Sequence, residues 1–237
     1  VSSINSISAL CESTQANINE VAKAIGMDSR IGEYFLKAGP GFGGSCFKKD
    51  ILNLIYICNH YGLKEVASYW EKVLSINNWQ QDRIIKIILE KLYGNVSGKK
   101  ISILGFSFKA NTNDTRESPA IKICKDLIEE GCFLSIYDPK VISEQIESVL
   151  GPNKYERNRN YPSNEGSWDL KKSVYEAAEE SDAIIIATEW SQFKNLDWNK
   201  LSRLLRRPSW VFDTRSILDV KKLEKLGINV WRVGLGK

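Results

Sequence analysis

A ten-residue segment, Gly-Phe-Gly-Gly-Ser-Cys-Phe-Lys-Lys-Asp at positions 41–50, carries residue types that could do covalent chemistry. Its glycines let the backbone turn sharply and approach a ligand closely. Cys46 stands just before an apolar helical pattern, and the positive end of a helix dipole favours a thiolate there. Asp50 lies four residues later, so the two side chains share one face of a helix. The combination predicts nucleophilic catalysis by Cys46, with Asp50 as a second catalytic group.

The competing interpretation of Cys46 is a structural thiol in a glycine-rich loop, because free cysteine is commonly buried and inert. The glycines before it and the charged cluster Lys48-Lys49-Asp50 after it favour a functional site. We therefore expect this segment to be the chemical centre of the protein.

The composition is that of a soluble globular protein. The 237 residues are enough for one large domain or two ordinary ones. Hydrophobic residues make up 43% and charged residues 26%, which is ordinary for a globular chain. The net charge of +4 comes from interspersed lysines and acids, so nucleic-acid binding is not indicated, whereas a local site for a small anion is allowed.

The five cysteines form no Cys-x-x-Cys pair, and their odd number without a signal peptide predicts free thiols in the reducing cytoplasm. Because His60 is the single histidine, neither a His-based metal site nor a Cys-His dyad is expected. No apolar run is long enough to cross a bilayer, so no membrane partner is expected. The chain starts without Met and with helical periodicity, which suggests a piece of a longer protein.

Helical periodicity dominates the first part of the chain, with helices predicted over 1–11, 18–25, 50–60 and 64–93. Asn17 and Glu20 have the spacing of a capping box for the second helix. The last helix has about thirty residues without Gly or Pro, a rod of about 45 Å. A rod of this length predicts a homodimer or higher homo-oligomer through 64–93. Two helices broken near Asn77 and Asn78 are the alternative.

After a turn-rich linker at 94–98, strands and helices alternate. Strands are predicted at 101–106, 133–137, 183–188, 210–213 and 228–233, and helices at 119–130, 173–180, 196–205 and 220–226. The segment 151–168 has a weak pattern and is predicted to be an exposed loop. The order predicts an α/β fold with a doubly wound, Rossmann-like parallel sheet. We expect a helical domain at 1–95 and a sheet domain at 96–237.

Ligands of doubly wound sheets bind beyond the carboxyl ends of the strands. Three polar clusters fall there: Phe108-Lys109, Glu189-Trp190 and Asp213-Thr214-Arg215. Their cations could be solvated surface charges, but their common location favours a binding site.

Gly105, with Asp138 after the next strand, echoes a dinucleotide fingerprint. The turn lacks the second and third glycines of that fingerprint, so a dinucleotide is not expected to lie there. Lys109 and Arg116 in the following loop suit a phosphate that is held by side chains.

The segment 41–50 resembles the active-site segment of the UDP-glucose 6-dehydrogenases, within the UDP-glucose/GDP-mannose dehydrogenase family. Further segments resemble the family in the family's own order: 2–6, 24–28, 103–106, Asn-Asp-Thr-Arg-Glu-Ser at 113–118, Tyr-Asp-Pro at 137–139 and Thr-Glu-Trp at 188–190. The resemblance covers essentially the whole chain, is closest to the eukaryotic type, and corresponds to the C-terminal two-thirds of such enzymes.

The resemblance implies a central helical segment with a long helix, followed by a domain that binds the UDP part of the substrate. The family's N-terminal NAD-binding domain, which holds most of that cofactor, has no counterpart in these residues, and neither has its catalytic lysine and asparagine segment. The implied reaction is the NAD-dependent oxidation of UDP-glucose to UDP-glucuronate through a cysteine thiohemiacetal and thioester. We expect a truncated chain that is inactive alone and at most binds the UDP portion.

The resemblance also implies roles for individual residues. Cys46 is the nucleophile, and Asp50 helps to activate water. Substrate contacts are implied for Phe35, Leu36, Lys37, Phe42, Gly43, Phe108, Lys109 and Arg215, the last with Ser216 beside it as a departure from animal members. Arg30 would reach into the neighbouring subunit's site, or else cap the preceding helix, and Arg116 would contact NAD. Glu189 and Trp190 are expected to be structural.

Two other functions stay open. The chain could come from a GDP-mannose or UDP-N-acetylmannosamine dehydrogenase, since these relatives share a similar cysteine loop. It could also be a non-catalytic module for nucleotide-sugar binding or dimerisation. Retention of both Cys46 and Asp50 argues weakly against that module.

Overall fold

The structure is a computed structural model that describes residues 1–153 and 166–236. In these ranges a sheet of six strands has the order β3-β2-β1-β4-β5-β6, and all neighbours are parallel. The strands are β1 (Lys100–Leu104), β2 (Phe133–Tyr137), β3 (Ser167–Leu170), β4 (Ala183–Ile186), β5 (Trp210–Asp213) and β6 (Asn229–Arg232). Growth in both directions from β1 is the order of a doubly wound fold, so the predicted fold class is confirmed.

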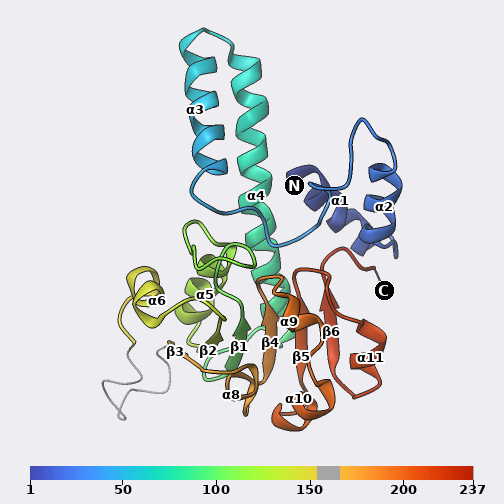
Figure 1. Cartoon of the computed structure of the whole chain (residues 1–237), viewed down its shortest axis with the longest axis vertical. Helices are drawn as coiled ribbons and strands as arrows, with labels where there is room; N and C mark the ends of the chain where they lie inside the picture. The colour runs from blue at the N-terminus through green and yellow to red at the C-terminus, as the bar shows by residue number, and fades with distance from the viewer. Residues whose placement is uncertain (154–165, 237) are drawn as a thin grey trace.

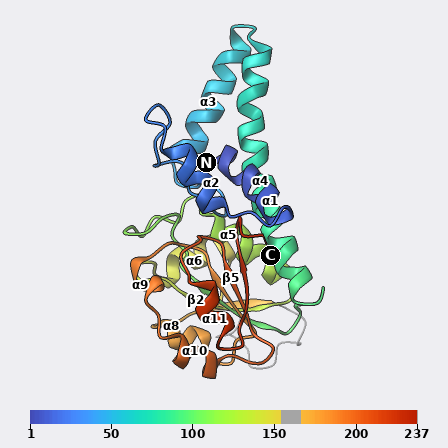
Figure 2. The ribbon, with the colours of Figure 1, turned by 90° about the vertical axis from the view of Figure 1, so that its right-hand side faces the viewer.

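Four helices precede the sheet: α1 (Ser2–Ser13), α2 (Ile18–Gly26), α3 (Phe47–His60) and α4 (Lys64–Lys91). The helices of the sheet part are α5 (Pro119–Glu129), α6 (Ser143–Leu150), α8 (Val174–Ala178), α9 (Ser191–Lys194), α10 (Trp198–Leu204) and α11 (Val220–Glu224). Helices α3 and α4 form a hairpin that stands away from the sheet (Figure 1), and the view from the side shows the same projection (Figure 2). Within the described ranges, no helix is both long and apolar enough to cross a membrane.

Helix α4 is continuous over 28 residues, so the alternative of a break near Asn77 and Asn78 is wrong. Its length is about 42 Å, because an α-helix rises about 1.5 Å per residue. The absence of Gly and Pro allows this length, and packing along both halves of the helix maintains it.

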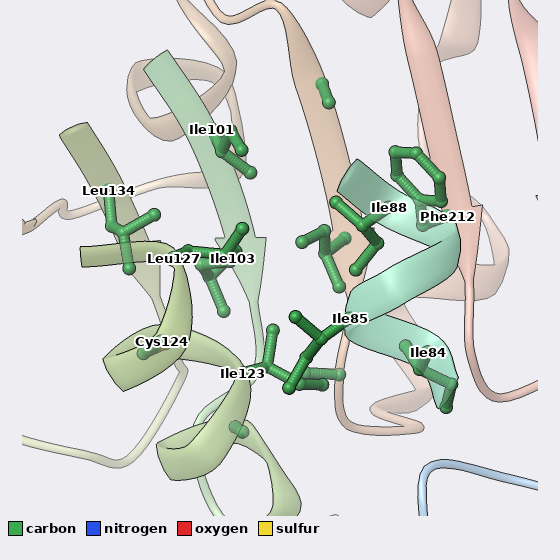
Figure 3. Close-up of a cluster of buried hydrophobic side chains, with 14 of the residues drawn as sticks. Ile84, Ile85, Ile88, Ile101, Ile103, Ile123, Cys124, Leu127, Leu134 and Phe212 are labelled. Atoms are coloured by element: carbon green, nitrogen blue, oxygen red, sulfur yellow. The ribbon is translucent and has the colours of Figure 1, made fainter. Parts of the chain in front are cut away.

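The last turns of α4 belong to the core of the sheet. Three of its isoleucines are at most 5% exposed: Ile84, Ile85 and Ile88. Figure 3 shows them beside buried side chains of β1 and α5, with Phe212 of β5 nearby. Burial of each such side chain contributes on the order of 2 kcal/mol. The hairpin is therefore anchored to the sheet by a shared apolar core, while its outer part has a small core of its own around Ile51 and Ile55.

The sequence pattern does not predict α6, the single turn α9 or the edge strand β3. Strand β3 begins at Ser167, inside the segment 151–168 that was expected to be a loop; residues 154–165 of that segment lie outside the described ranges. The loop expectation is thus wrong at its C-terminal end. A strand of four residues is too short to show a period, and it is fixed by Trp168, which is 2% exposed and donates to the Gly151 carbonyl at 3.1 Å.

The carboxyl ends of the central strands are aligned. Leu104 at the end of β1 pairs with Ile186 of β4, and Ile186 pairs with Asp213 of β5. Gly105 turns the chain at φ +92° directly after β1, so the strand ends before the predicted 106. The three predicted polar clusters therefore leave the same edge of the sheet, and the loop after β1 rises toward the base of α3 (Figure 1).

Candidate active site

Cys46 lies at the N-cap position of α3 with its thiol exposed. Its carbonyl accepts the Asp50 amide at 2.8 Å, and its Sγ lies 3.5 Å from Ser45 Oγ. The other cysteines of the chain are buried, and burial raises the pKa of Cys132 to about 12 and that of Cys124 further. Cys46 is therefore the one thiol of the described residues that an external reagent reaches directly. Asp50 is exposed in the first turn of the same helix.

The glycine loop before Cys46 is wedged against the loop that follows β1. Gly44 donates its amide to the Arg116 carbonyl at 2.9 Å. A Cβ on Gly43 would lie 2.2 Å from the Glu117 carbonyl oxygen, so only glycine fits. Gly44 has φ +88°, and a Cβ there would lie 3.0 Å from the Phe108 ring. The fold thus brings Cys46 to the edge of the sheet where Phe108 and Arg116 lie.

Arg116 and Lys109 are cations on this loop. Arg116 is exposed and forms an ion pair with Asp114 at 2.7 Å. Its hydrogen bond to Asp114 and the negative charge of that carboxylate raise the pKa of Arg116. Lys109 is exposed, with Nζ 5.3 Å from the centre of the Phe108 ring. Both cations are available to an anionic ligand.

Arg215 is a buried cation that joins three strand ends. Its side chain is 13% exposed, Nε donates to the Ala187 carbonyl at 2.8 Å, and Nη2 donates to the Phe108 carbonyl at 3.4 Å. Its Nη1 lies 3.1 Å from Glu189 Oε2 in an ion pair outside hydrogen-bond geometry, since that oxygen accepts no hydrogen bond from the described residues. Burial lowers the pKa of Arg215, and the acids beside it oppose this shift. A solvated surface charge is therefore excluded for Arg215, and Glu189 is its partner.

A hollow of about 650 Å³ lies between α2, the segment after it and the loop after β5. It brings together three of the predicted substrate residues: Leu36, Lys37 and Arg215. Lys23 and Lys194 also line it, together with Glu33 and Glu189. The hollow therefore presents more cations than anions, as a binding site for a phosphorylated ligand requires.

Two predicted residues stand apart from this arrangement. Arg30 is 86% exposed and pairs with Asp28 at 2.6 Å, and Phe35 is 68% exposed. Neither residue lines the hollow. Cys46 and Lys109 lie outside the hollow as well, and Arg215 links the two places through the Phe108 carbonyl.

The carboxylate of Asp138 accepts its hydrogen bonds from groups of the protein itself. One of its carboxylate oxygens accepts from the amides of Phe106 and Ser107, from Ser107 Oγ and from Trp190 Nε1, at 2.7–3.2 Å. A Cβ on Gly105 would lie 2.4 Å from Thr188 Cβ, so this turn is closed. The turn at the end of β1 is therefore packed against Thr188, and the Asp138 carboxylate is hydrogen bonded within the protein, with Trp190 as one of its donors. Among the described residues, no group of three His, Cys, Asp or Glu side chains could hold a metal ion.

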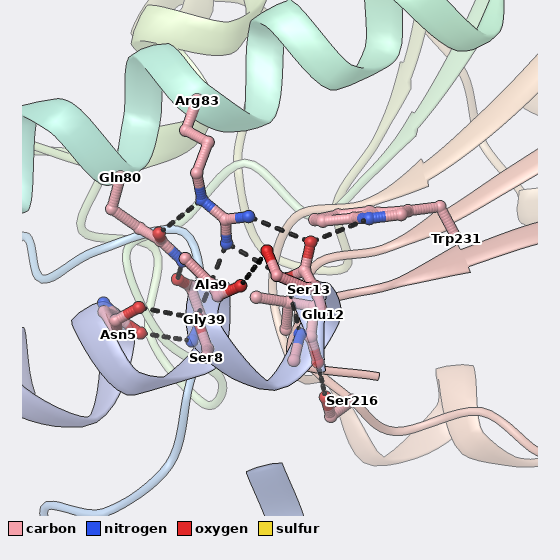
Figure 4. A network of polar contacts seen from close by, with 12 residues as sticks. Asn5, Ser8, Ala9, Glu12, Ser13, Gly39, Gln80, Arg83, Ser216 and Trp231 are labelled. Atoms are coloured by element: carbon pink, nitrogen blue, oxygen red, sulfur yellow. Dashed lines mark hydrogen bonds and ion pairs between the residues drawn. The ribbon is translucent and has the colours of Figure 1, made fainter. Parts of the chain in front are cut away.

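Sequence reasoning missed the amides that hold the segment before the glycine loop. Asn5 of α1 accepts the Gly39 amide at 2.9 Å, and Gln80 of α4 donates to the Gly39 carbonyl at 2.9 Å (Figure 4). In the same view Arg83 pairs with Glu12 at 2.9 Å. A signal was available: polar amides on the inner face of a long helix are unusual unless they have partners.

Family models match most of the chain. Residues 1–79 match the central domain of the UDP-glucose/GDP-mannose dehydrogenase family, and residues 102–220 match its UDP binding domain. The UDP-glucose 6-dehydrogenase of Drosophila melanogaster is 48% identical over 241 residues, which cover 99% of this chain and 49% of that protein. UDP-glucose 6-dehydrogenase 2 of Arabidopsis thaliana is 46% identical over 240 residues, which cover 99% of this chain and 50% of that protein.

A solved structure agrees with these sequence relatives. The UDP-glucose dehydrogenase of the archaeon Pyrobaculum islandicum matches with a TM-score of 0.78 at 28% identity, covering 100% of this chain and 48% of its own. The chain spans about half the length of its curated relatives, so the expected share of two-thirds is wrong. Two family models, long matches at this identity and a common fold confirm the resemblance read from the motifs. The chain belongs to the UDP-glucose/GDP-mannose dehydrogenase family.

Proposed function

We propose that the chain forms the nucleophile-bearing and UDP-binding part of an enzyme that oxidises UDP-glucose to UDP-glucuronate. The observation that carries the proposal is the exposed Cys46 at the start of α3, held by its glycine loop against the loop after β1. Relatives named UDP-glucose 6-dehydrogenase, at 45–48% identity, support this choice of substrate.

In this proposal the C6 alcohol of UDP-glucose first loses a hydride and a proton and becomes the 6-aldehyde. The Cys46 thiolate then adds to the carbonyl carbon of this aldehyde and forms a C–S bond. Removal of a hydride from that carbon converts the adduct to a thioester. Water then attacks the thioester carbon, the C–S bond breaks, and Cys46 leaves as the thiolate while the 6-carboxylate forms. Asp50, in the first turn of the same helix, takes a proton from this water.

The diphosphate of the substrate is matched by cations along the sheet edge. Arg215 and Lys37 line the hollow, and Lys109 lies on the loop after β1. Guanidinium and ammonium groups bind phosphate oxygens through charge-assisted hydrogen bonds. The remaining contacts of the proposal come from Phe35, Leu36 and Phe108, with Phe42 and Gly43 around the sugar.

NAD supplies the hydride acceptor in such a reaction. Because the turn after β1 is closed and Asp138 is occupied, we place no dinucleotide on this sheet. The exposed guanidinium of Arg116 fits a single contact to the cofactor from the side. The Gly-x-Gly-x-x-Gly spacing occurs at 39–44, but among the described residues no strand precedes it, so it lacks the strand–turn–helix context of a dinucleotide-binding turn. We propose that by themselves the 237 residues do not turn over UDP-glucose.

Nucleotide binding and turnover test the proposal separately. UDP is expected to raise the melting temperature of the chain while GDP does not, and UDP-glucose is expected to act better than UDP-N-acetylmannosamine. The protein encoded by the complete open reading frame is expected to reduce NAD when UDP-glucose is added, as followed by NADH absorbance. Stabilisation by GDP alone would favour a GDP-mannose dehydrogenase, and UDP binding without any turnover would favour the non-catalytic module.

We also propose a homodimer or larger homo-oligomer that forms through the α3–α4 hairpin. This hairpin exposes a set of large apolar side chains, and an exposed apolar patch of this kind is typical of a protein–protein interface. The set consists of Leu52, Tyr56, Ile57, Tyr61, Leu63, Val66 and Tyr69. Arg30, which projects from the chain, would then reach the neighbouring subunit. Tyr56→Glu is expected to weaken association in analytical ultracentrifugation, and a monomeric wild-type protein at micromolar concentration would contradict the proposal.

The free cysteines of the chain fit an enzyme of the reducing cytoplasm.

A further inference from the structure

Three side-chain amides lie buried on one side of α4, where a helix that only packed against its neighbours would carry apolar residues. Asn77, Gln80 and Gln81 are 5%, 0% and 9% exposed. Burial of an amide is unfavourable unless it is hydrogen bonded. Because α4 is unbroken at Asn77, this residue is not there to interrupt the helix.

The Asn77 side chain forms two hydrogen bonds with the backbone of Phe42, in the loop that leads to Cys46. Its Oδ1 accepts the Phe42 amide at 2.7 Å, and its Nδ2 donates to the Phe42 carbonyl at 3.3 Å. Both backbone groups of Phe42 are therefore paired with one side chain, as if by a neighbouring strand. Gly41 makes room for this grip, since it has φ +115° and a Cβ on it would lie 2.8 Å from Asn77 Oδ1.

Two contacts connect Asn77 with Cys46: Asn77 binds the backbone of Phe42, and the Phe42 side chain packs against Phe47. The ring of Phe42 packs edge to face on the ring of Phe47, with 4.6 Å between the ring centres. Phe47 is the first residue of α3 and the direct neighbour of Cys46. On its other side the loop cannot retreat, because Gly43 is pressed against the Glu117 carbonyl.

We propose that Asn77 is a positioning residue for the reaction of Cys46: it acts through Phe42 and Phe47 to fix the start of α3, and it touches neither substrate nor thiol. The inference deepens the proposed function and rests on it. A thiol displaced by about 1 Å from its attack position reacts on the order of 100-fold more slowly. The cost is expected in kcat, because the cations that hold UDP come from other segments.

The test compares Asn77→Ala with Asn78→Ala in the protein made from its complete open reading frame. Asn78 is the adjacent residue of α4 and is exposed, so it is a matched control. For Asn77→Ala we expect kcat to fall on the order of 100-fold while the affinity for UDP changes less than about threefold. Asn78→Ala is expected to match the wild type. A kcat for Asn77→Ala within about twofold of the wild type, or parallel losses of kcat and UDP affinity, would overturn the inference.

A second variant, Asn77→Asp, keeps the test decisive if Asn77→Ala does not fold. Asn77→Asp has the same shape and keeps the acceptor for the Phe42 amide, but it sets an oxygen against the Phe42 carbonyl. If Asn77→Ala fails to fold, Asn77→Asp is measured in its place and is expected to show the same loss of kcat. Normal turnover by Asn77→Asp would then contradict the inference.

Alkylation of Cys46 by iodoacetamide separates this inference from the proposed function, because it needs no substrate. A helix N-terminus favours the reactive thiolate, so a displaced Cys46 is expected to react at least about threefold more slowly in the Asn77 variants. If the wild type failed to oxidise UDP-glucose, only the proposed function would fall, and this rate would decide the role of Asn77. Unchanged alkylation in that case would overturn the inference.

Discussion

The amide of Gly44 donates to the carbonyl of Arg116 at 2.9 Å, and this bond joins the cysteine loop to the sheet. Gly43 beside it lies against the Glu117 carbonyl, and Lys48 of α3 pairs with Glu117 at 2.8 Å. The helical part and the sheet part thus meet at the residues that sequence motifs single out. The chemistry proposed for Cys46 depends on this junction.

Arg215→Ala is expected to destabilise the protein by about 2–3 kcal/mol, because it removes charged hydrogen bonds to two part-buried backbone carbonyls and leaves Glu189 without its partner. It is also expected to weaken UDP binding, as measured by calorimetry. Urea unfolding gives the stability, with Lys194→Ala as the control. Lys194 lines the same hollow but is exposed, so its replacement is expected to change stability by less than about 0.5 kcal/mol. Equal stability of the two variants would show that Arg215 has no structural role.

Gly43→Ala is expected to cost about 1–3 kcal/mol, because its Cβ would overlap the Glu117 carbonyl and force the two loops apart. Gly39→Ala is the matched control. Neither glycine has a positive φ, and a Cβ on Gly39 would meet Arg215 and Thr214 at an ordinary 3.5–3.8 Å. Thermal unfolding and iodoacetamide labelling of Cys46 report on the two variants. Equal unfolding temperatures and equal labelling rates of the two variants would refute the close contact between Gly43 and the Glu117 carbonyl.

Asp114 is expected to make acid stability depend on Arg116. The hydrogen bond from Arg116 lowers the pKa of Asp114 from its ordinary value of 3.8. A carboxyl with a lowered folded pKa contributes stability above its unfolded pKa and loses it as the pH falls through the folded value. The stability difference between wild type and Asp114→Asn should therefore be present near about pH 6 and shrink below about pH 4.

Arg116→Gln provides the control for this pH effect, since it removes the guanidinium partner of Asp114 and keeps the backbone amide that donates to the same carboxylate at 2.9 Å. In that background the stability difference caused by Asp114→Asn is expected to be smaller and to change less with pH. A difference that persisted undiminished in acid, or that was equally large in the Arg116→Gln background, would refute the pairing.

The sequence allowed the fold to be predicted where patterns are long or repeated. The buried strand Ala183–Ile186 and the Pro119 helix start carry strong local signals, and the glycines before Cys46 mark the close approach to Glu117. Short elements could not be predicted, because β3 and α9 have four residues each and are fixed by contacts from elsewhere.

The candidate site was predictable in its residue types but not in its arrangement. Motifs do not show that Arg215 lies among strand ends with Glu189, or that Asp138 is occupied by the turn after β1. The grip of Asn77 on Phe42 joins residues 35 positions apart, and sequence spacing carries no signal for such a contact.

The most direct test of the account is to look for the covalent adduct on Cys46. The protein from the complete open reading frame would be mixed with UDP-glucose and NAD, quenched with acid during turnover, digested, and examined by mass spectrometry. We expect the Cys46 peptide alone to carry the mass of the bound UDP-sugar acyl group, and Cys46→Ser to abolish both the adduct and glucuronate formation while unfolding as the wild type does. Glucuronate formation by Cys46→Ser at an undiminished rate, or an adduct on another residue, would contradict the account.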